Sequence, residues 1–396
     1  IEVEFSLTKI QLGWSVASLT LTATLAMMLA GPLSDKIGRR PVLKIAAVLF
    51  AVSAVASAVA PNFVLLVIAR MIGGLGVGAA LIIAPVYIAE VAPAALRGRM
   101  VSFNQLNIVI GISVAFFSNY LILTLGQGDS AWAGSLHLGD WGWRWMLGVE
   151  ALPAALYFFA LLLIPESPRW LAMRGREDEA LQILEKVCGP EQARTDLQEV
   201  HNSISAASNQ QRVSIKQLFT PAMKLVMTIA ISVAILQQIT GINSVFFYAP
   251  MIFEQSGIGT DASFMQAILV GLVNIVFTLV AMALIDKLGR RPLLGFGLAG
   301  IAVCMLTLSY GFGSATYTLN QSAIDTLPAG IERQLVAPLT DIRFDSDVEF
   351  RTALSDAIGK NTYKQHESQL VSAAISMNQT LILIGILGFV ASFAIS

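Results

Sequence analysis

The chain contains one short charged phrase twice, each time between two long apolar runs. Residues 35–41 read Asp-Lys-Ile-Gly-Arg-Arg-Pro, and residues 286–292 read Asp-Lys-Leu-Gly-Arg-Arg-Pro. Each copy follows a stretch long enough to cross a bilayer and precedes another, so each is predicted to be a tight loop between two membrane helices. Recurrence about 250 residues later indicates two halves built on one plan, as in transporters made of parallel repeats. The sequence therefore predicts a membrane carrier.

Composition agrees with a membrane protein. Charged residues make up 13% of the chain and hydrophobic residues 55%, against about 25% and 45–50% in an ordinary globular domain. The net charge of −1 gives no reason to expect a nucleic acid partner. A membrane helix needs about 20 apolar residues, and nine runs approach that length: 12–33, 42–60, 63–87, 99–125, 142–164, 222–249, 264–285, 293–313 and 373–396.

Basic residues are distributed unevenly over the short loops between these runs. One set of loops holds Lys36, Arg39, Arg40, Arg97, Arg99, Lys287, Arg290 and Arg291. The loops at 61–62, 126–141 and 250–263 hold no Lys or Arg. Because positively charged short loops stay in the cytoplasm, the first set is predicted to face inward and Ile1 to begin outside.

Two polar segments divide the chain. Residues 165–221 are predicted to be a cytoplasmic linker with one or two helices within 176–207, since that stretch has helical spacing. The linker separates an N-terminal half (1–164) from a C-terminal half (222–396). Residues 314–372 form a polar insertion on the outer face of the second half, and nothing in its sequence indicates a function.

Several phrases together resemble the sugar porter family of the major facilitator superfamily. They are residues 31–40, 97–98, 165–170 (Pro-Glu-Ser-Pro-Arg-Trp), 237–243 (Gln-Gln-Ile-Thr-Gly-Ile-Asn) and 286–291. The resemblance covers almost the whole chain except the insertion. It implies an all-α major facilitator fold of two pseudo-repeated six-helix halves around a central cavity. Nine of the twelve spans are expected here, with the first helix and the last two missing.

Neutral amides within the spans are candidates for contacts to a sugar. An amide offers one acceptor oxygen and two donor hydrogens, which suits hydroxyl groups that both donate and accept. The candidates are Gln105, Gln237, Gln238, Asn243 and Asn274. The resemblance implies that the Gln237–Gln238–Asn243 set binds the sugar, whereas a lone intramembrane amide can instead bond to a neighbouring helix.

Helix geometry adds an expectation about two of these amides. On a continuous helix Asn243 would lie about 140° around from Gln238, so we expect Gly241 to interrupt the helix and turn both side chains toward one side. Phe247 and Tyr248, which follow Phe246, resemble the outer gate of the family. Packing against lipid or core is the alternative for these rings. Ile112 stands where a proton-coupled relative in this family has a second glutamine, so the resemblance does not identify the sugar.

Charged residues form two further groups. Arg70 and Glu150 each lie about eight residues from the outer end of a span, about 12 Å deep. The resemblance implies that they take part in proton coupling, with a static ion pair as the alternative. It also implies a cytoplasmic latch of exposed ion pairs between the halves, formed by Asp35, Arg39, Arg40, Glu90, Arg97, Glu166, Arg169, Asp286, Arg290 and Arg291.

The sequence thus predicts import of a monosaccharide, a pentose or hexose, by alternating access. Proton symport is favoured over passive uniport, and a sugar sensor on the same fold is a further alternative. His137, His201 and His366 stand alone, so we expect no metal site, no cofactor and no enzyme. The expected partners are a sugar, a proton and the lipid bilayer. We expect a monomer in a bacterial inner membrane.

Overall fold

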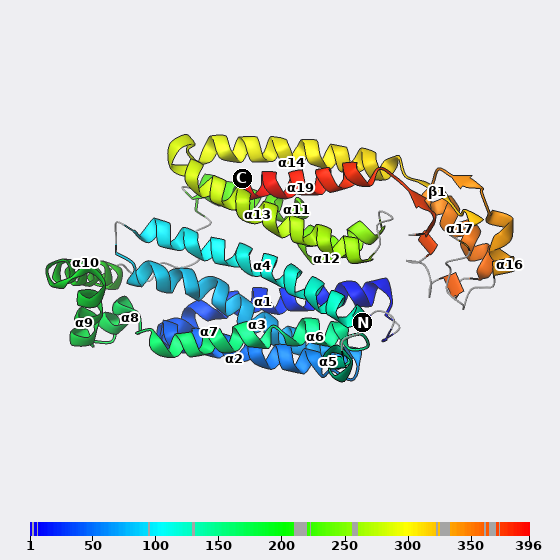
Figure 1. Cartoon of the computed structure of the whole chain (residues 1–396). Helices are drawn as coiled ribbons and strands as arrows, with labels where there is room; N and C mark the ends of the chain where they lie inside the picture. The colour runs from blue at the N-terminus through cyan, green and yellow to red at the C-terminus, as the bar shows by residue number, and fades with distance from the viewer. Residues whose placement is uncertain are drawn as a thin grey trace. The chain divides into compact units, whose positions relative to one another are not determined.

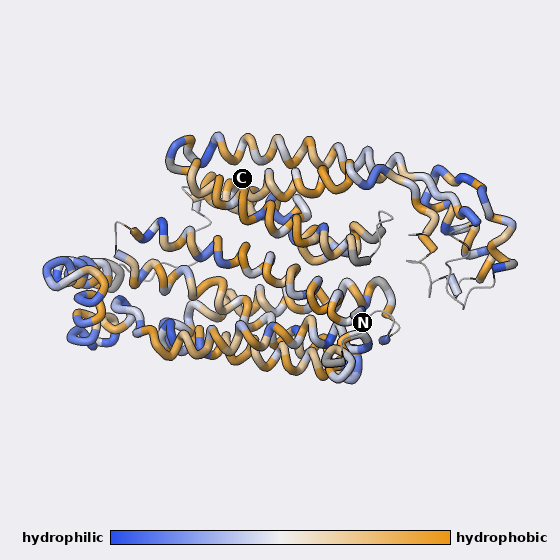
Figure 2. Tube along the Cα trace, viewed as in Figure 1, coloured by the Kyte–Doolittle hydropathy of each residue, from blue (hydrophilic) through white to orange (hydrophobic). Residues whose placement is uncertain are grey.

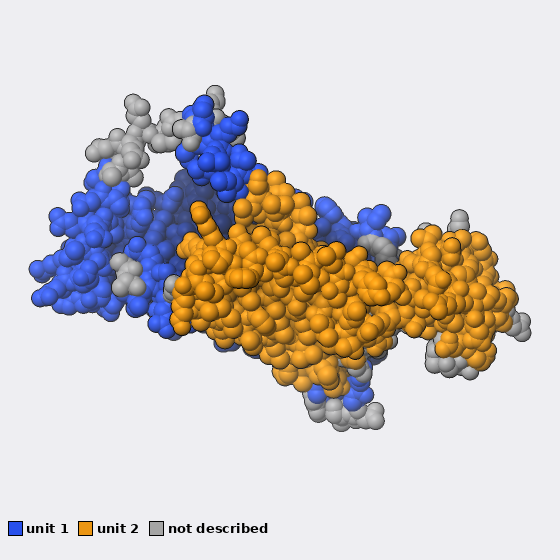
Figure 3. Space-filling view, turned by 90° about the horizontal axis from the view of Figure 1, so that it is seen from above, with its two compact units in different colours: residues 1–107, 125–231 blue, residues 108–124, 232–396 orange. Residues whose placement is uncertain are grey.

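The structure is a computed structural model that describes the chain except residues 2–3, 6, 94–95, 129–130, 210–219, 222, 256–259, 322–323, 325–332, 360–361, 364–369 and 372. The described residues form two compact units (Figure 3). Unit 1 comprises Ile1–Asn107 and Leu125–Ile231, and unit 2 comprises Ile108–Thr124 and Ser232–Ser396. The units are defined by contacts, whereas the predicted halves follow topology, and those predicted boundaries stay predictions.

Unit 1 is built from apolar helices around α3. Its helices are α1 (Lys9–Ile37), α2 (Arg39–Ala58), α3 (Phe63–Val91), α5 (Ala131–Ser135), α6 (Gly142–Gly148), α7 (Ala151–Leu163), α8 (Pro168–Met173), α9 (Glu177–Cys188) and α10 (Pro190–Asn209), with parts of α4 (Arg97–Gln127) and α11 (Lys224–Ile239). α3 packs against α1 and α2, and α7 packs against α2 (Figure 1). Gly74 and Gly78 of α3 face main-chain carbonyls of α1, where a side chain would clash, so they allow close helix packing.

Unit 2 contains the rest of α4 and α11 together with α12 (Ile242–Gln255), α13 (Thr260–Leu288), α14 (Arg290–Gly313) and α19 (Gln379–Ile395). α19 packs along α14 and α13. A buried cluster joins α12, α13, α14 and α19: it contains Ile242, Ala249, Phe253, Ala267, Val270, Ile301, Ile382, Ile386, Phe389 and Val390.

Eight helical stretches of the described residues are long and apolar enough to cross a membrane. They correspond to the first eight predicted runs, and Figure 2 shows their apolar character beside the polar α9 and α10. The ninth run is shorter than predicted. α19 begins at Gln379 rather than at 373, because the Asn378 side chain caps the helix and residues 375–376 form a strand.

Both copies of the charged phrase adopt the predicted tight turn between helices. α1 ends at Ile37 and α2 begins at Arg39, with only Gly38 between them at φ 104°. In the second copy Gly289 lies between α13 and α14 at φ 80°. Positive φ strains any residue with a side chain, which explains the glycine at this point of both copies. The prediction of a repeated interhelical turn is confirmed.

The insertion is a folded subdomain, which the sequence did not predict. It contains β1 (Thr316–Thr318), α16 (Arg333–Val336), the 3₁₀ helix η2 (Ala337–Leu339), β2 (Arg343–Phe344) and α17 (Asp347–Ile358), and β3 (Ile375–Ser376), just after the predicted bounds, belongs to the same subdomain. The strands form an antiparallel sheet in the order β2-β1-β3. The expectation of an all-α chain therefore holds for the spans but not here.

A separate hydrophobic core holds the insertion together. Phe350 and Leu354 of α17 are fully buried against the sheet, and the ring of Tyr317 stacks on Phe350 with centroids 5.2 Å apart. Arg351 Nε donates to Asp347 Oδ1 at 2.6 Å along the same helix. Burial raises the pKa of Tyr317, and the neighbouring Asp347 carboxylate raises it further. α17 and β1 thus depend on each other for their packing.

Replacing Phe350 with alanine is expected to unfold the insertion and leave the spans intact. Removing a fully buried phenylalanine costs about 3–5 kcal/mol, more than a small subdomain tolerates. Amide hydrogen exchange over residues 333–359 should accelerate strongly while exchange in α3 stays slow. Val348→Ala, at a side chain that is 71% exposed, is the matched control. Equal protection in both variants would show that the insertion does not depend on this core.

Candidate functional site

The predicted break near Gly241 brings two of the candidate amides together. α11 ends at Ile239 and α12 begins at Ile242, with Gly241 at φ 80° between them. Asn243 Nδ2 donates to Gln238 Oε1 at 2.9 Å. A continuous helix would turn these side chains apart, so the glycine produces the contact. The predicted geometry is confirmed, whereas the role of the pair in sugar binding stays a prediction.

The other candidate amides differ in their surroundings. Gln237, like Gln238 and Asn243, is exposed. Asn274 of α13 is buried, with 6% of its surface exposed. Gln105 is exposed on the part of α4 that belongs to unit 1. Among the described residues, the contact between candidate amides is therefore the hydrogen bond from Asn243 to Gln238.

The three aromatic residues after Asn243 do not share one environment. Phe246 packs against the buried cluster of unit 2. Phe247 is 49% exposed, and Tyr248 is half-buried. Core packing thus accounts for Phe246, while a gate formed by Phe247 and Tyr248 stays a prediction.

Glu150 lies at a break within its span. α6 ends at Gly148 and α7 begins at Ala151. Pro153 has no N–H to donate to the carbonyl of Val149 four residues earlier, and Leu152 N donates to that carbonyl instead at 3.1 Å. The Glu150 side chain is exposed, and the charge of Arg70 on α3 acts on it. Arg70 Nε also donates to the main-chain carbonyl of Ser15 on α1 at 2.7 Å.

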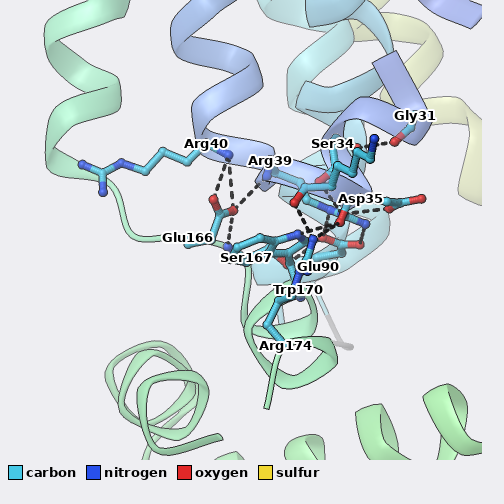
Figure 4. Close-up of polar contacts among 11 residues, drawn as sticks. Gly31, Ser34, Asp35, Arg39, Arg40, Glu90, Glu166, Ser167, Trp170 and Arg174 are labelled. Atoms are coloured by element: carbon cyan, nitrogen blue, oxygen red, sulfur yellow. Dashed lines mark hydrogen bonds and ion pairs between the residues drawn. The ribbon is translucent and has the colours of Figure 1, made fainter. Parts of the chain in front are cut away.

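A buried ion pair lies at the predicted inner end of unit 1 (Figure 4). Arg39 Nε donates to Glu90 Oε2 at 2.9 Å, and Arg39 Nη2 donates to Glu90 Oε1 at 3.0 Å. The Arg39 side chain is 7% exposed and that of Glu90 is 9% exposed. Arg39 Nη1 completes the arrangement with Ser34 O at 3.1 Å and Asp35 Oδ1 at 2.9 Å. The expectation of exposed pairs in the latch is therefore wrong for Arg39 and Glu90.

Glu166 caps the N-terminus of α2. Its carboxylate accepts from the backbone N–H groups of Arg39 at 3.1 Å and Arg40 at 3.2 Å. A carboxylate is favourable there because the first N–H groups of a helix lack intrahelical partners. A side chain on Gly38 would occupy the space of this carboxylate, a second reason for glycine in the first phrase.

Ser167 connects α8 to this network, and the sequence did not predict its part. Its hydroxyl donates to Glu90 Oε2 at 2.6 Å and accepts from Trp170 N at 3.3 Å, which makes Ser167 the N-cap of α8. The available signal was local: serine followed by proline is typical of a helix start. The local pattern does not indicate its contact with Glu90, which lies 77 positions away in the chain.

Side chains from the linker and from α2 complete the contacts at this end by bonding to carbonyls. Trp170 Nε1 donates to Asp35 O at 3.1 Å, and Arg174 Nη2 donates to the carbonyls of Asp35 and Lys36. Arg40 donates to the carbonyls of Leu161 and Leu162, which satisfies the last turn of α7. Five predicted latch residues are thus connected: Asp35, Arg39, Arg40, Glu90 and Glu166.

The remaining latch residues lie elsewhere. Arg97 and Arg169 line a cavity of about 380 Å³ with Glu90 and with residues of α9 and α10. Arg290 and Arg291 are exposed in unit 2. The side chain of Asp286 is outside what the structure describes. Within the described part of the chain, no group of three or more His, Cys, Asp or Glu residues could hold a metal ion.

Known proteins are similar in sequence to this chain over most of its length. A family described as "Sugar (and other) transporter" matches residues 3–327. The arabinose-proton symporter of Bacillus subtilis (strain 168) is 38% identical over 308 residues, 78% of this chain and 64% of that protein. The D-xylose-proton symporter of Escherichia coli (strain K12) is 38% identical over 328 residues, 78% of this chain and 63% of that protein. The chain spans less than two thirds of the length of these relatives.

A solved structure shares the fold. It is the partially occluded inward open conformation of the xylose transporter XylE from E. coli, with a TM-score of 0.65 and 31% sequence identity. The match covers 97% of this chain and 80% of that one. The predicted major facilitator fold is confirmed by this likeness. The family match ends at residue 327, so most of the insertion lies outside it.

Replacing Glu90 with glutamine is expected to destabilise the protein strongly. Removing one partner of a buried ion pair costs about 3–5 kcal/mol, and among the described residues Arg39 would keep only the carboxylate of Asp35, whose side chain is 61% exposed. Glu179→Gln, which removes an exposed pair with Arg176, should leave the stability almost unchanged, because solvent screens the two charges. Thermal unfolding of the purified protein in detergent compares the two variants. Similar midpoints would mean that the Arg39–Glu90 pair does not support the fold.

Proposed function

The chain belongs to the sugar transporter family of the major facilitator superfamily, and from this premise we propose that it imports a monosaccharide by alternating access with protons. The sequence-based resemblance to sugar porters is thereby confirmed, and the family is one of multi-pass membrane transporters rather than enzymes. The substrate class, a pentose or hexose, and the direction of transport are part of the proposal. So is its location in a bacterial inner membrane.

The amide pair at the Gly241 break is the observation that carries the proposal. In the Asn243–Gln238 hydrogen bond each amide uses one group, which leaves the Gln238 NH₂ and the Asn243 oxygen for a ligand. Both side chains are exposed rather than buried in helix packing. A broken helix that presents polar groups within a span is a recurring feature of transporter binding sites. Gln237 and Asn274 of the same unit complete the proposed sugar site, and Gln105 of unit 1 stays a sequence-based candidate.

Proton coupling is proposed for Glu150 and Arg70. An ionisable pair within a span is expensive and usually functional. The relatives named above are an arabinose-proton and a D-xylose-proton symporter. A passive facilitator is the second candidate, because the Ser15 carbonyl holds Arg70 whatever the protonation state of Glu150.

Replacing Gln238 with alanine is expected to weaken sugar binding about tenfold, which corresponds to about 1.4 kcal/mol. The variant loses its own donors and the contact that orients Asn243. Isothermal titration with xylose and glucose measures the change, and the unfolding midpoint shows that the fold is intact. Gln182→Ala on the exposed face of α9 is the control. Undiminished affinity in Gln238→Ala would remove the amide pair from the site.

Uptake by the full-length protein in proteoliposomes tests the coupling. Labelled xylose or glucose should accumulate above equilibrium only with an inward proton gradient. Glu150→Gln, which cannot ionise, should equilibrate the sugar without accumulating it. Equilibration alone in the unmodified protein would identify a facilitator, and binding without flux would identify a sensor.

A further inference from the structure

Arg144 of the short helix α6 joins three segments at the predicted outer end of unit 1. Its Nη1 donates to the carbonyls of Ala58 at 3.1 Å and Ala60 at 2.9 Å, at the end of α2. Its Nη2 donates to Glu4 Oε1 at 2.7 Å, in the segment before α1. One guanidinium group therefore holds both the end of α2 and the segment before α1. Its planar, forked geometry allows it to donate to several acceptors at once.

Trp143 strengthens the hold on the segment before α1. Its indole Nε1 donates to Glu4 Oε2 at 2.5 Å, and the Phe5 ring meets its edge with centroids 5.7 Å apart. The Arg144 guanidinium lies 4.4 Å from the centroid of the same indole ring. Hydrogen bonds from Arg144 and Trp143 lower the pKa of Glu4, so its carboxylate stays ionised at neutral pH.

The break before α7 gives these contacts a consequence for Glu150. α6 has only seven residues, and Pro153 in the first turn of α7 removes one backbone hydrogen bond between the two helices. Because the connection is weakened at this point, the contacts that hold α6 contribute to its direction together with α7, which packs on α2. Glu150 lies at this break, six residues after Arg144.

Arg70, whose charge acts on Glu150, is connected to the same point through α1. The Ser15 carbonyl that accepts from Arg70 belongs to α1, and the segment leading into α1 is held through Glu4. α2 carries its charges Arg39, Arg40 and Lys44 in its first two turns, at its opposite end.

We propose that Arg144 is a positioning residue for the Glu150–Arg70 pair. By fixing α6 to α2 and to the segment before α1, it sets where Glu150 meets Arg70. The inference rests on the proposed proton coupling and deepens it. It assigns a function to the outer contacts of α6 that the sugar site does not explain.

Spin-label distances in the full-length protein test the structural step. Labels at Asp140, beside α6, and at Leu163, at the end of α7, occupy exposed positions, and Cys188 and Cys304 are replaced by serine. Arg144→Gln should broaden the distance distribution, because α6 loses its hold. Pro153→Ala restores the missing backbone hydrogen bond between α6 and α7. The distance distribution should then be narrow whether residue 144 is arginine or glutamine. An unchanged distribution in Arg144→Gln would overturn the proposal.

Transport by the same samples tests the functional step. Arg144→Gln should lose gradient-driven accumulation while its sugar affinity stays unchanged, whereas a general loss of structure would lower both. Glu179→Gln is the control for removal of an ion pair. Retained accumulation despite a broadened distribution would also overturn the proposal. Absence of accumulation in the unmodified protein would refute proton coupling itself, which is a distinguishable result.

Discussion

The Arg39–Glu90 ion pair is the interaction on which the inner end of unit 1 depends. Burying two charges costs several kcal/mol per ion unless the remaining hydrogen-bond groups are also satisfied. Here Arg39 reaches α1 through Ser34 and Asp35, and Glu90 reaches α8 through Ser167. Satisfying one buried pair therefore requires four helices, α1, α2, α3 and α8, to meet at one place. The cap on α2 is a consequence of the same convergence, because Glu166 directly precedes Ser167.

Two helix breaks have the opposite effect, because polar side chains lie exposed at them instead of being buried. A span must satisfy its backbone hydrogen bonds internally, so a break is tolerated only where other groups replace them. Pro153 produces one break through a missing donor, and Gly241 produces the other through a positive φ. Glu150 lies at the first and the Gln238–Asn243 contact spans the second. In each unit the proposed chemistry is thus placed where the regular helix stops.

These cases also show how far local sequence predicts this molecule. The spans, the turns at Gly38 and Gly289 and the break at Gly241 could be predicted, because each depends on composition or on one residue's backbone preferences. The burial of Arg39 with Glu90 could not, since 51 positions separate them in the chain and both occur in a pattern typical of exposed loop charges. The contact between Glu4 and Arg144 could not be predicted either, because these residues are 140 positions apart in the chain. The insertion escaped prediction because its short strands become stable only through a shared core.

Comparison of the two copies of the charged phrase distinguishes what local sequence determines from what tertiary contacts determine. Both form the same turn, yet Glu166 covers the first, whereas a side chain on Gly289 would meet nothing within 4 Å beyond the adjoining residues of its own chain. Arg290 and Arg291 are exposed, while Arg39 is buried. Exposed pairs contribute about 0–1 kcal/mol and break readily, whereas loss of a buried partner costs about 3–5 kcal/mol. The exposed arginines are therefore better suited than Arg39 to the predicted latch. Arg39 and Glu90 are suited to holding α1, α2, α3 and α8 of unit 1 together.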